Sequence, residues 1–243
     1  MHRQISRGAQ PAQPNPHRLG PCVGYHSLHH IDGAFAFPLS PETRSRLPPA
    51  LRHATPKRQR EFLAGRWCAE QALQRLGAGS THVAMAEDRA PVWPDGVVGS
   101  ITHSGDFAAA GVAWAADIAG LGIDSEQIID PAAADDIAAV CMVEEATLFR
   151  AVHGRSYCDF CTGVFSAKEA VFKCLFPLTR KFIEFSDVRI TSLDWDREYF
   201  AWTTVSDHSG TGRVSHADGF VHTSVELPSL RRALAPTNAA SLR

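Results

Sequence analysis

The pattern that most constrains the fold is a long helix-like segment followed by several short strand-like runs, and it occurs once in each half of the chain. The first helix is predicted over residues 56–76, where Thr55 can cap it, Pro56 suits its first turn and Gly77 can end it. The second is predicted over residues 160–175, with Pro177 as its stop. This repetition predicts an α+β fold built from two similar lobes that pack face to face.

The remaining segments divide the chain further. Asp135 or Asp136 can cap a short helix that ends near residue 140, a second short helix is predicted over 144–152, and DHSGTG resembles a hairpin connection. We expect a disordered tail at 1–21, an N-terminal lobe at 22–118, a C-terminal lobe at 119–227 and a second tail at 228–243. Strands are predicted at 83–86, 98–102, 108–115, 119–123, 182–185, 188–191, 200–205 and 220–225.

Charge and composition exclude several classes of protein. The net charge of −2 argues against a general nucleic-acid or membrane coat, although residues 1–66 hold ten basic against three acidic residues and form a candidate anion-binding surface. The longest uncharged apolar stretch, 107–116, is too short to span a bilayer, and the first residues lack the apolar core of a secretory signal. Six irregularly spaced cysteines do not form a disulfide framework. We therefore expect a reduced, cytoplasmic protein with no stable membrane insertion.

The segment GLGIDSEQI carries the most informative pair of acidic residues. Asp124 and Glu126 directly follow the run predicted as a strand at 119–123. Because side chains alternate along extended backbone, both carboxylates point to the same side and can reach one point. Paired carboxylate oxygens suit Mg²⁺, and Mn²⁺ accepts the same ligands, whereas the alternative is a pair of solvated loop acids.

A second set of charges lies on the helix predicted over 160–175. Glu169 and Lys173 are four residues apart and share a helix face, which also fits a simple surface ion pair. Lysine is scarce in this chain, with four lysines among 24 basic residues, and this helix holds Lys168 and Lys173. A lysine ammonium is a compact partner for phosphate, so the helix is a candidate phosphate-binding element.

Other motifs carry less information. His103 in GSITHS suits phosphate binding or proton transfer, but a hydrogen-bonded turn histidine explains it equally well. The pair Cys158 and Cys161 lacks the partners of a zinc site, and His26, His29 and His30 lie beside the predicted tail. The absence of P-loop, GxGxxG and GxSxG motifs weighs against P-loop hydrolases, Rossmann dehydrogenases and α/β-hydrolases.

Taken in order, four motifs between residues 57 and 185 resemble the 4'-phosphopantetheinyl transferase family, in particular its enterobactin-synthetase-component-D and surfactin-synthetase-activating types. The motifs are KRQREFLAGRWCAEQAL, GSITHS, GIDSE, which matches the family's GxDxE, and FSAKEAVFK, which matches its WxxKEAxxK. Two positions depart from the family pattern: Phe165 replaces the tryptophan of the last motif, and Arg89 stands where relatives often have lysine.

The resemblance implies a pseudodimer of two α+β lobes with coenzyme A and Mg²⁺ in the cleft between them. It implies an enzyme that moves the phosphopantetheine arm of coenzyme A to a serine of an apo acyl or peptidyl carrier protein and releases 3',5'-ADP. Such enzymes serve polyketide, nonribosomal peptide or siderophore synthesis. Carried over by motif, the metal ligands are Asp124, Glu126 and Glu169, the catalytic residues are Glu169 and Lys173, and the coenzyme A contacts are Arg58, Arg66, Arg89, Thr102, His103, Lys168 and Lys173.

The basic residues of the N-terminal region suggest a docking surface for the carrier protein, and other functions compete with the transferase interpretation. An acidic carrier protein is expected to dock near Arg44, Arg46 and Arg52, and two lobes in one chain favour a monomer. One alternative is a noncatalytic module that binds coenzyme A or a carrier protein. Such a module is expected to have lost one of the metal carboxylates, and all three are present in this sequence. A nucleic-acid-binding protein is disfavoured because the basic region lacks interleaved aromatic residues, and a nuclease leaves the lysine helix unexplained.

Overall fold

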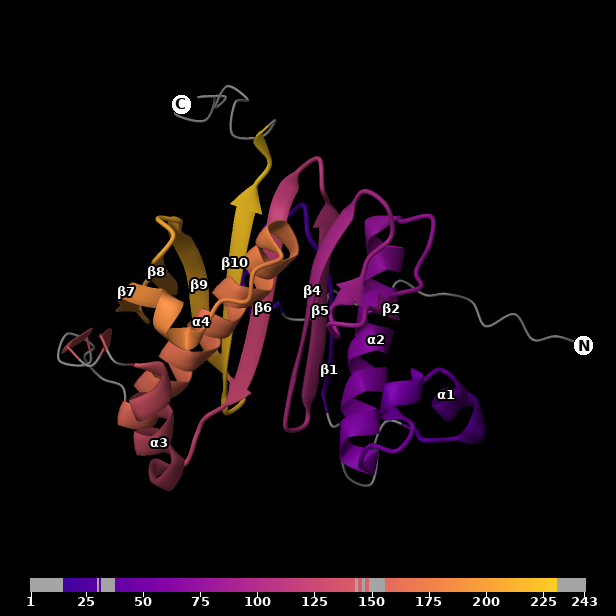
Figure 1. Cartoon of the computed structure of the whole chain (residues 1–243), viewed down its shortest axis with the longest axis horizontal. Coiled ribbons are helices and arrows are strands. Elements are labelled where there is room, and N and C mark those ends of the chain that lie inside the picture. The colour runs from indigo at the N-terminus through magenta and orange to yellow at the C-terminus, as the bar shows by residue number, and fades with distance from the viewer. Residues whose placement is uncertain are drawn as a thin grey trace, which may run out of the picture.

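The computed structural model describes residues 15–29, 31, 38–142, 144–145, 147–148 and 156–230. Its strands form two main antiparallel sheets and one small hairpin (Figure 1). The first sheet has the order β1-β5-β4, with β1 at Gly24–His29, β4 at Val97–Ser104 and β5 at Phe107–Trp114. The hairpin pairs β2, Ala84–Met85, with β3, Pro91–Val92.

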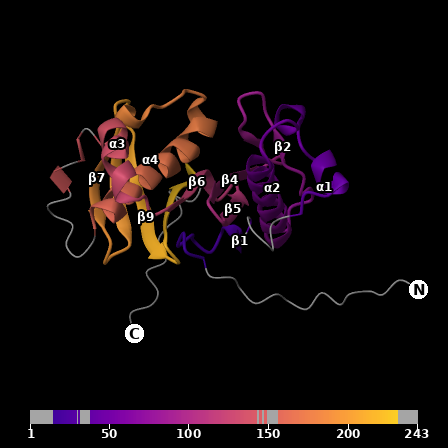
Figure 2. The ribbon, with the colours of Figure 1, turned by 90° about the horizontal axis from the view of Figure 1, so that it is seen from below.

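The second sheet has five strands in the order β6-β10-β9-β8-β7. Within the described residues, four α-helices accompany the sheets, and α2 packs on the first sheet while α4 packs on the second. Seen from below, α2 and α4 lie on the same side of the strands (Figure 2). The strands are β6 Ile118–Gln127, β7 Val188–Asp194, β8 Tyr199–Thr204, β9 Ser209–Ala217 and β10 Phe220–Pro228; the helices are α1 Pro41–Ser45, α2 Pro56–Leu76, α3 Pro131–Cys141 and α4 Tyr157–Thr179; the turns are η1 Pro49–Leu51 and η3 Phe185–Asp187.

The long N-terminal helix has the ends that its sequence predicts. The Thr55 side chain accepts a hydrogen bond from the Arg58 backbone N–H, and Pro56 fills the first helical position, where no N–H is needed. Gly77 ends the helix in the left-handed conformation, with φ of 77°. Small buried residues face the first sheet, so α2 lies close to β5 and β1.

Hydroxyl groups join the two sheets where β4 meets β6. Ser100, Thr102 and Ser104 alternate along β4, so their side chains all point to the same face. Their oxygens accept hydrogen bonds from the backbone N–H groups of Ile123 (3.0 Å), Ser125 (2.9 Å) and Gln127 (3.3 Å). The two strands are therefore connected by a hydroxyl ladder instead of a backbone ladder, and the first sheet is fixed against the second.

Glycine residues on β6 let α4 lie directly on the strand. A Cβ at Gly122 would come within 1.9 Å of the Ala170 carbonyl oxygen, and one at Gly120 would meet Cys174 at 3.0 Å. Gly120, Gly122, Asp124 and Glu126 share one face of β6. The close approach at the glycines therefore brings α4 against the part of β6 that carries both carboxylates.

The mixed α and β structure is confirmed, and several predicted boundaries are wrong. β6 continues to Gln127, because the Ser and Thr hydroxyls of β4 and the backbone of β10 make hydrogen bonds with its backbone N–H and C=O groups. Asp124 and Glu126 therefore lie within the strand and not after it. α3 begins earlier than predicted, since Asp130 and not Asp135 or Asp136 caps it. The predicted helix at 144–152 falls mostly outside the described residues.

Three further differences lie in the second half of the chain. Pro177 stands inside α4 and does not stop it: it is in the last turn, and Arg180 ends the helix with φ of 54°. The predicted strand at 182–185 is absent, because this segment packs beside α4 and leads into η3. β9 was not predicted, since its SGTG start resembles a turn; glycines 210 and 212 instead make room for Trp202 and Phe200.

The N-terminal tail boundary also differs from the prediction. Residues 15–21 pack against the second sheet, where His17 is fully buried, and so they do not belong to a disordered tail. Their polar composition hides this contact, because His17 is their one buried side chain, Leu19 is half-buried, and backbone groups make several of the hydrogen bonds.

The contact between α4 and β6 gives a direct stability prediction. Gly122→Ala should lower the free energy of unfolding by about 3 kcal/mol, because the new methyl group meets backbone that cannot move without shifting the helix. Urea denaturation followed by circular dichroism measures it. The matched control is Gly79→Ala, whose Cβ has nothing within 4 Å; equal destabilisation by both variants would contradict the packing argument.

Candidate active site

The two carboxylates of β6 are held by the hydroxyls of β4. Thr102 donates a hydrogen bond to Asp124 Oδ1 at 3.3 Å, and Ser104 donates to Glu126 Oε2 at 2.8 Å. Asp124 is only 1% exposed. The hydroxyl ladder that joins the sheets therefore also orients both acidic side chains. Thr102 itself is buried, and its hydroxyl donates to Asp124 and accepts from the Ser125 backbone N–H.

Helix α4 adds a cation and a third carboxylate. Lys173 Nζ lies 2.5 Å from Asp124 Oδ1, and Glu169 stands one turn earlier on the same helix. Burial alone would lower the pKa of Lys173, but Asp124, Glu169 and Glu126 together raise it above its usual value. Lys173 is therefore a permanent positive charge among the three carboxylates.

When all three carboxylates are ionised, they carry more negative charge than Lys173 neutralises. Burial, and then the neighbouring charge of Asp124, raises the pKa of Glu126 to about 8, although Ser104 and Lys173 oppose the shift. Burial also raises the pKa of Glu169. Buried carboxylates whose pKa values are raised in this way gain stability from a further cation.

The residues fit a divalent cation in their chemistry. Asp124 Oδ2 is buried and has no hydrogen-bond partner, and carboxylate oxygens are the donors that Mg²⁺ prefers. Across the described ranges, no group of three or more His, Cys, Asp and Glu side chains is already arranged to hold a metal ion. Lys173 occupies one side of Asp124, so the orphaned Oδ2 is the oxygen left for a cation.

A polar cluster from α2 and β4 lies next to these carboxylates. Arg58 donates a hydrogen bond to His103 Nε2 at 2.8 Å, and Glu61 Oε2 lies 3.4 Å from Arg58 and 3.8 Å from His103 Nδ1. Burial first, and Arg58 second, lower the pKa of His103 to about 4. His103 is therefore neutral near pH 7 and accepts from Arg58, which is still partly exposed to solvent.

Arg66 is a buried cation farther along α2. Its guanidinium lies 4.8 Å from the Phe62 ring centre and donates to the Ala84 carbonyl at 3.3 Å, while its Nε has no partner. Burial lowers its pKa to about 10, so it keeps its charge at neutral pH. An arginine with an unused buried donor is suited to an anionic ligand.

The turn between β2 and β3 carries Arg89, which is exposed and has a φ of 68°. Asp88 in the same turn lies 3.6 Å from Arg180 at the end of α4. This exposed ion pair connects the hairpin beside the first sheet with the helix on the second, and Arg89 is the residue that follows Asp88 in the turn.

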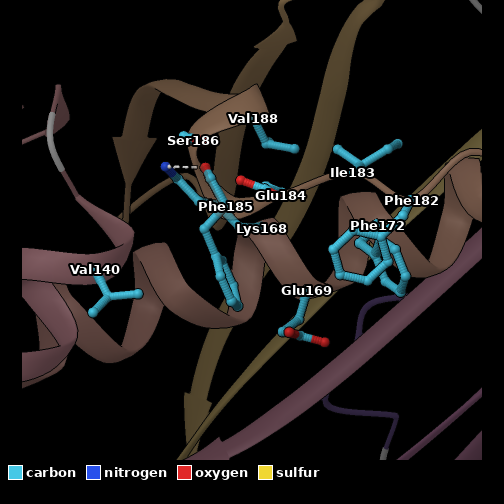
Figure 3. Close-up of a pocket in the computed structure, with 10 residues that line it drawn as sticks. All are labelled: Val140, Lys168, Glu169, Phe172, Phe182, Ile183, Glu184, Phe185, Ser186 and Val188. Carbon is cyan, nitrogen blue, oxygen red and sulfur yellow. Dashed lines mark hydrogen bonds between the residues drawn. The ribbon is translucent and has the colours of Figure 1, made fainter.

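Lys168 is not brought into this cluster. Its ammonium is buried and donates to the Phe185 carbonyl at 3.0 Å (Figure 3). It also pairs with Glu145 Oε1 at 2.8 Å. Glu145 Oε1 also accepts from the Ile190 backbone N–H at 2.9 Å. Lys168 therefore ties α4 to η3 and β7 inside the protein. Its motif position gave no sign of this, since Glu145 is remote in sequence.

A cavity beside Glu169 was not found from the sequence. It has a volume of about 320 Å³ and lies between α4 and the segment before β7 (Figure 3). Phe172, Phe182 and Ile183 give it an apolar wall, and Phe182 is 75% exposed. The segment 182–185 was predicted as a strand, and only its packing beside α4 creates the cavity.

The remaining sequence motifs form no second site in the described residues. All six cysteines are free thiols, so Cys158 and Cys161 form no disulfide. His26 is buried against Trp67, and His30 lies outside the described residues. Within the same ranges, no helix combines the length and apolar character needed to cross a lipid bilayer.

Comparison with known proteins identifies the family. Residues 47–113 match the model of the 4'-phosphopantetheinyl transferase N-terminal domain, and residues 120–224 match the model of the 4'-phosphopantetheinyl transferase superfamily. The chain belongs to this superfamily. The first match ends in β5 and the second begins in β6.

Three similar proteins support the assignment. The chain is 41% identical to 4'-phosphopantetheinyl transferase Svp of Streptomyces mobaraensis over 56% of each chain. It is 32% identical to PptT of Mycobacterium tuberculosis over 64% of this chain and 66% of PptT. It is 35% identical to enterobactin synthase component D of Salmonella typhimurium over 59% of this chain and 58% of that protein. Each match spans less than two thirds of the relative.

The position of Lys168 predicts how its variants behave. Lys168→Met should lower the free energy of unfolding by about 3 kcal/mol or more, because it leaves the buried Glu145 carboxylate unpaired. Adding Glu145→Gln should recover part of that loss, since the amide oxygen still accepts from Ile190 and no buried charge remains unpaired. Chemical denaturation of both single variants and the double variant measures the coupling.

Coenzyme A affinity distinguishes a structural role of Lys168 from the coenzyme A contact that its motif position predicts. The double variant, once its stability is recovered, should bind coenzyme A as the unmodified protein does in calorimetric titrations. A stable double variant that loses coenzyme A affinity would instead assign Lys168 to the ligand.

Proposed function

We propose that this protein transfers the phosphopantetheine moiety of coenzyme A to a serine hydroxyl of an apo acyl or peptidyl carrier protein and releases 3',5'-ADP. The observation that carries the proposal is the convergence of Asp124, Glu126 and Lys173, with Glu169 one turn away, inside the residues that match the superfamily model. Relatives named as phosphopantetheinyl transferases and as enterobactin synthase components support a role in polyketide, peptide or siderophore synthesis.

Coenzyme A is proposed to lie between α2 and α4, the two halves acting as the lobes of a pseudodimer with the active site in the cleft between them. The diphosphate meets Lys173, and the nucleotide phosphates meet Arg58 with its partner His103, Arg66 and Arg89. Their unused donors support this: Arg66 Nε has no partner, and Arg58 and Arg89 are at least partly exposed. Thr102 contributes by orienting Asp124 and not through a free hydroxyl.

A divalent cation, with Mg²⁺ the first choice, is proposed to bind Asp124, Glu126 and Glu169. When bound, it neutralises diphosphate charge and so stabilises the leaving 3',5'-ADP. The orphaned Asp124 Oδ2 and the raised pKa of Glu126 support these ligands. Lys173 holds Asp124 on its other oxygen and so keeps the carboxylate in a fixed orientation.

The proposed reaction is one displacement at phosphorus. The carrier serine oxygen attacks the phosphorus that bears the pantetheine group and forms a new P–O bond. The P–O bond to the bridging oxygen breaks, and its electron pair leaves with 3',5'-ADP. The serine proton passes to the Glu169 carboxylate, or to a water that this carboxylate orients. Lys173 stabilises the charge that develops on the leaving phosphate.

The cavity beside Glu169 is proposed to receive the pantetheine arm. An arm of mainly methylene and amide groups fits an apolar wall with a few polar groups, and Phe172, Phe182 and Ile183 provide such a wall. The cavity adjoins the carboxylate proposed to take the serine proton. The arm would therefore extend from the diphosphate toward the surface at Phe182.

The carrier protein is proposed to dock beside the cleft near α1. Arg44 and Arg52 are exposed there, while Arg46 already pairs with Glu70. Two exposed arginines suit a partner with an acidic helix next to its serine, and their attraction weakens with salt. The protein is proposed to act as a monomer in the cytoplasm, without nucleic acid.

Intact-protein mass spectrometry tests the proposed function. An apo carrier protein incubated with this protein, coenzyme A and Mg²⁺ should gain the mass of one phosphopantetheine group. EDTA and Asp124→Ala should abolish the gain, because both remove the cation from the diphosphate. Coenzyme A binding without any gain across several carrier types would point to a noncatalytic binding module, and no binding at all would refute both functions.

The proton acceptor has its own test. Glu169→Gln should reduce single-turnover transfer by about 100-fold or more, because the amide cannot take the serine proton. Asp196→Asn, a carboxylate-to-amide change in the exposed turn between β7 and β8, is the matched control and should retain full activity. Undiminished transfer by folded Glu169→Gln would remove Glu169 from this role.

A further inference from the structure

The segment at residues 15–23 lies across the second sheet, behind the strand that presents Asp124. The Pro16 carbonyl accepts a hydrogen bond from Ser215, the His17 carbonyl accepts from Ser224 Oγ at 2.7 Å, and the Gly20 N–H donates to Glu226 Oε1 at 2.8 Å. These partners lie on β9 and β10, about two hundred residues later in the chain. The segment is therefore a fixed part of the fold.

The His17 imidazole reaches from this segment to the backbone of β6. Its Nε2 lies 3.2 Å from the Asp124 carbonyl oxygen and 2.9 Å from Ser125 Oγ, and its Nδ1 lies 3.3 Å from the Tyr25 hydroxyl. Ser125 Oγ also lies 2.9 Å from His222 Nδ1. His17 is fully buried, so no water competes for these contacts.

One arrangement of hydrogens satisfies the whole chain of contacts. A carbonyl oxygen can only accept, so the contact with Asp124 requires that His17 Nε2 carry the proton. This one N–H is shared between the Asp124 carbonyl oxygen and Ser125 Oγ, and Nδ1 then accepts from Tyr25. Ser125 accepts from His17 and donates to His222 Nδ1. Burial lowers the pKa of both histidines, which agrees with the neutral rings this arrangement needs.

The contact acts on the proposed metal ligand from its back side. Side chains alternate along β6, so Ser125 points toward His17 while Asp124 and Glu126 point toward α4. His17 contacts Asp124 at its backbone carbonyl oxygen and not at its carboxylate. The hydroxyls of β4 hold the same two residues from the other edge of the strand.

We propose that His17 is a positioning residue for the metal site, because its imidazole fixes the backbone of Asp124 and Ser125 and so sets the direction of the Asp124 carboxylate. The inference rests on the proposed metal-dependent function. Groups that orient metal ligands typically change metal affinity by about 10-fold to 100-fold when they are removed.

Mn²⁺ binding tests the inference without measuring turnover. Free Mn²⁺ is measured by electron paramagnetic resonance at fixed coenzyme A, with the unmodified chain, His17→Phe and His17→Gln. His17→Phe should weaken Mn²⁺ binding by about 10-fold or more, because a phenyl ring cannot donate to Asp124. His17→Gln, whose amide N–H can donate, should recover much of the affinity.

A matched control separates positioning from loose packing. Ser215→Ala removes the hydrogen bond to Pro16 and leaves the imidazole contacts in place, so it should not change Mn²⁺ affinity. Denaturation and circular dichroism establish which variants are folded, and His17→Gln keeps the test open where His17→Phe does not fold. Unchanged affinity in a folded His17→Phe, equal loss in Ser215→Ala, or a His17→Gln as weak as His17→Phe would overturn the inference.

Transfer measurements distinguish this inference from the proposed function. A chain that transfers phosphopantetheine, yet binds Mn²⁺ equally well with and without His17, would overturn only the role of His17. No Mn²⁺ binding and no transfer by the unmodified chain would overturn both.

Discussion

The site depends on hydroxyl groups that replace a backbone ladder between β4 and β6. Ordinary strand pairing would have used the N–H groups of β6 and left its side chains without oriented partners. In this protein the oxygens of Thr102 and Ser104 accept from that backbone while their hydrogens go to Asp124 and Glu126. The same atoms therefore join the two sheets and orient the carboxylates, so the site cannot be separated from the connection between the sheets.

Electrostatics then determines what the site can bind. Lys173 offsets part of the carboxylate charge, and burial makes the rest costly, as the raised pKa of Glu126 indicates. Around this negative centre lie cations with spare donors, Arg58 and Arg66 among them. A ligand that is anionic, brings a divalent cation and extends an apolar arm satisfies all three features. Coenzyme A with Mg²⁺ has this combination.

Sequence analysis predicted the two long helices and most strands because their signals are local. Thr55, Pro56 and Gly77 give the ends of α2 directly. The predicted strand ends were less accurate. β6 continues past its apolar run only because β4 and β10 make hydrogen bonds with its backbone groups. The carboxylates and Lys173 were found from spacing and motif resemblance, and Asp124 and Lys173 do meet.

What the sequence did not reveal depends on distant partners. Lys168 has a motif position that indicates a ligand contact, yet its partner Glu145 can be identified only from the fold. The cavity at Phe182 exists because an irregular segment packs beside α4. His17 lies among proline, glutamine and arginine residues that indicate a disordered tail, and no local sequence pattern predicts its hydrogen bond to Asp124.

The contacts of the His17 segment also have a consequence for how the chain folds. The hydrogen bond between Ser224 and the His17 carbonyl closes a loop of 207 residues, and it needs β10 to be in place. Contacts of such high sequence separation form late, because the entropy of loop closure must be overcome first. Residue 17 is synthesised 207 residues before Ser224, so it cannot dock until β10 has been made. A ribosome-bound chain that lacks β10 therefore leaves the back of the Asp124 strand uncovered, and the proposed metal site matures only after β10 is in place.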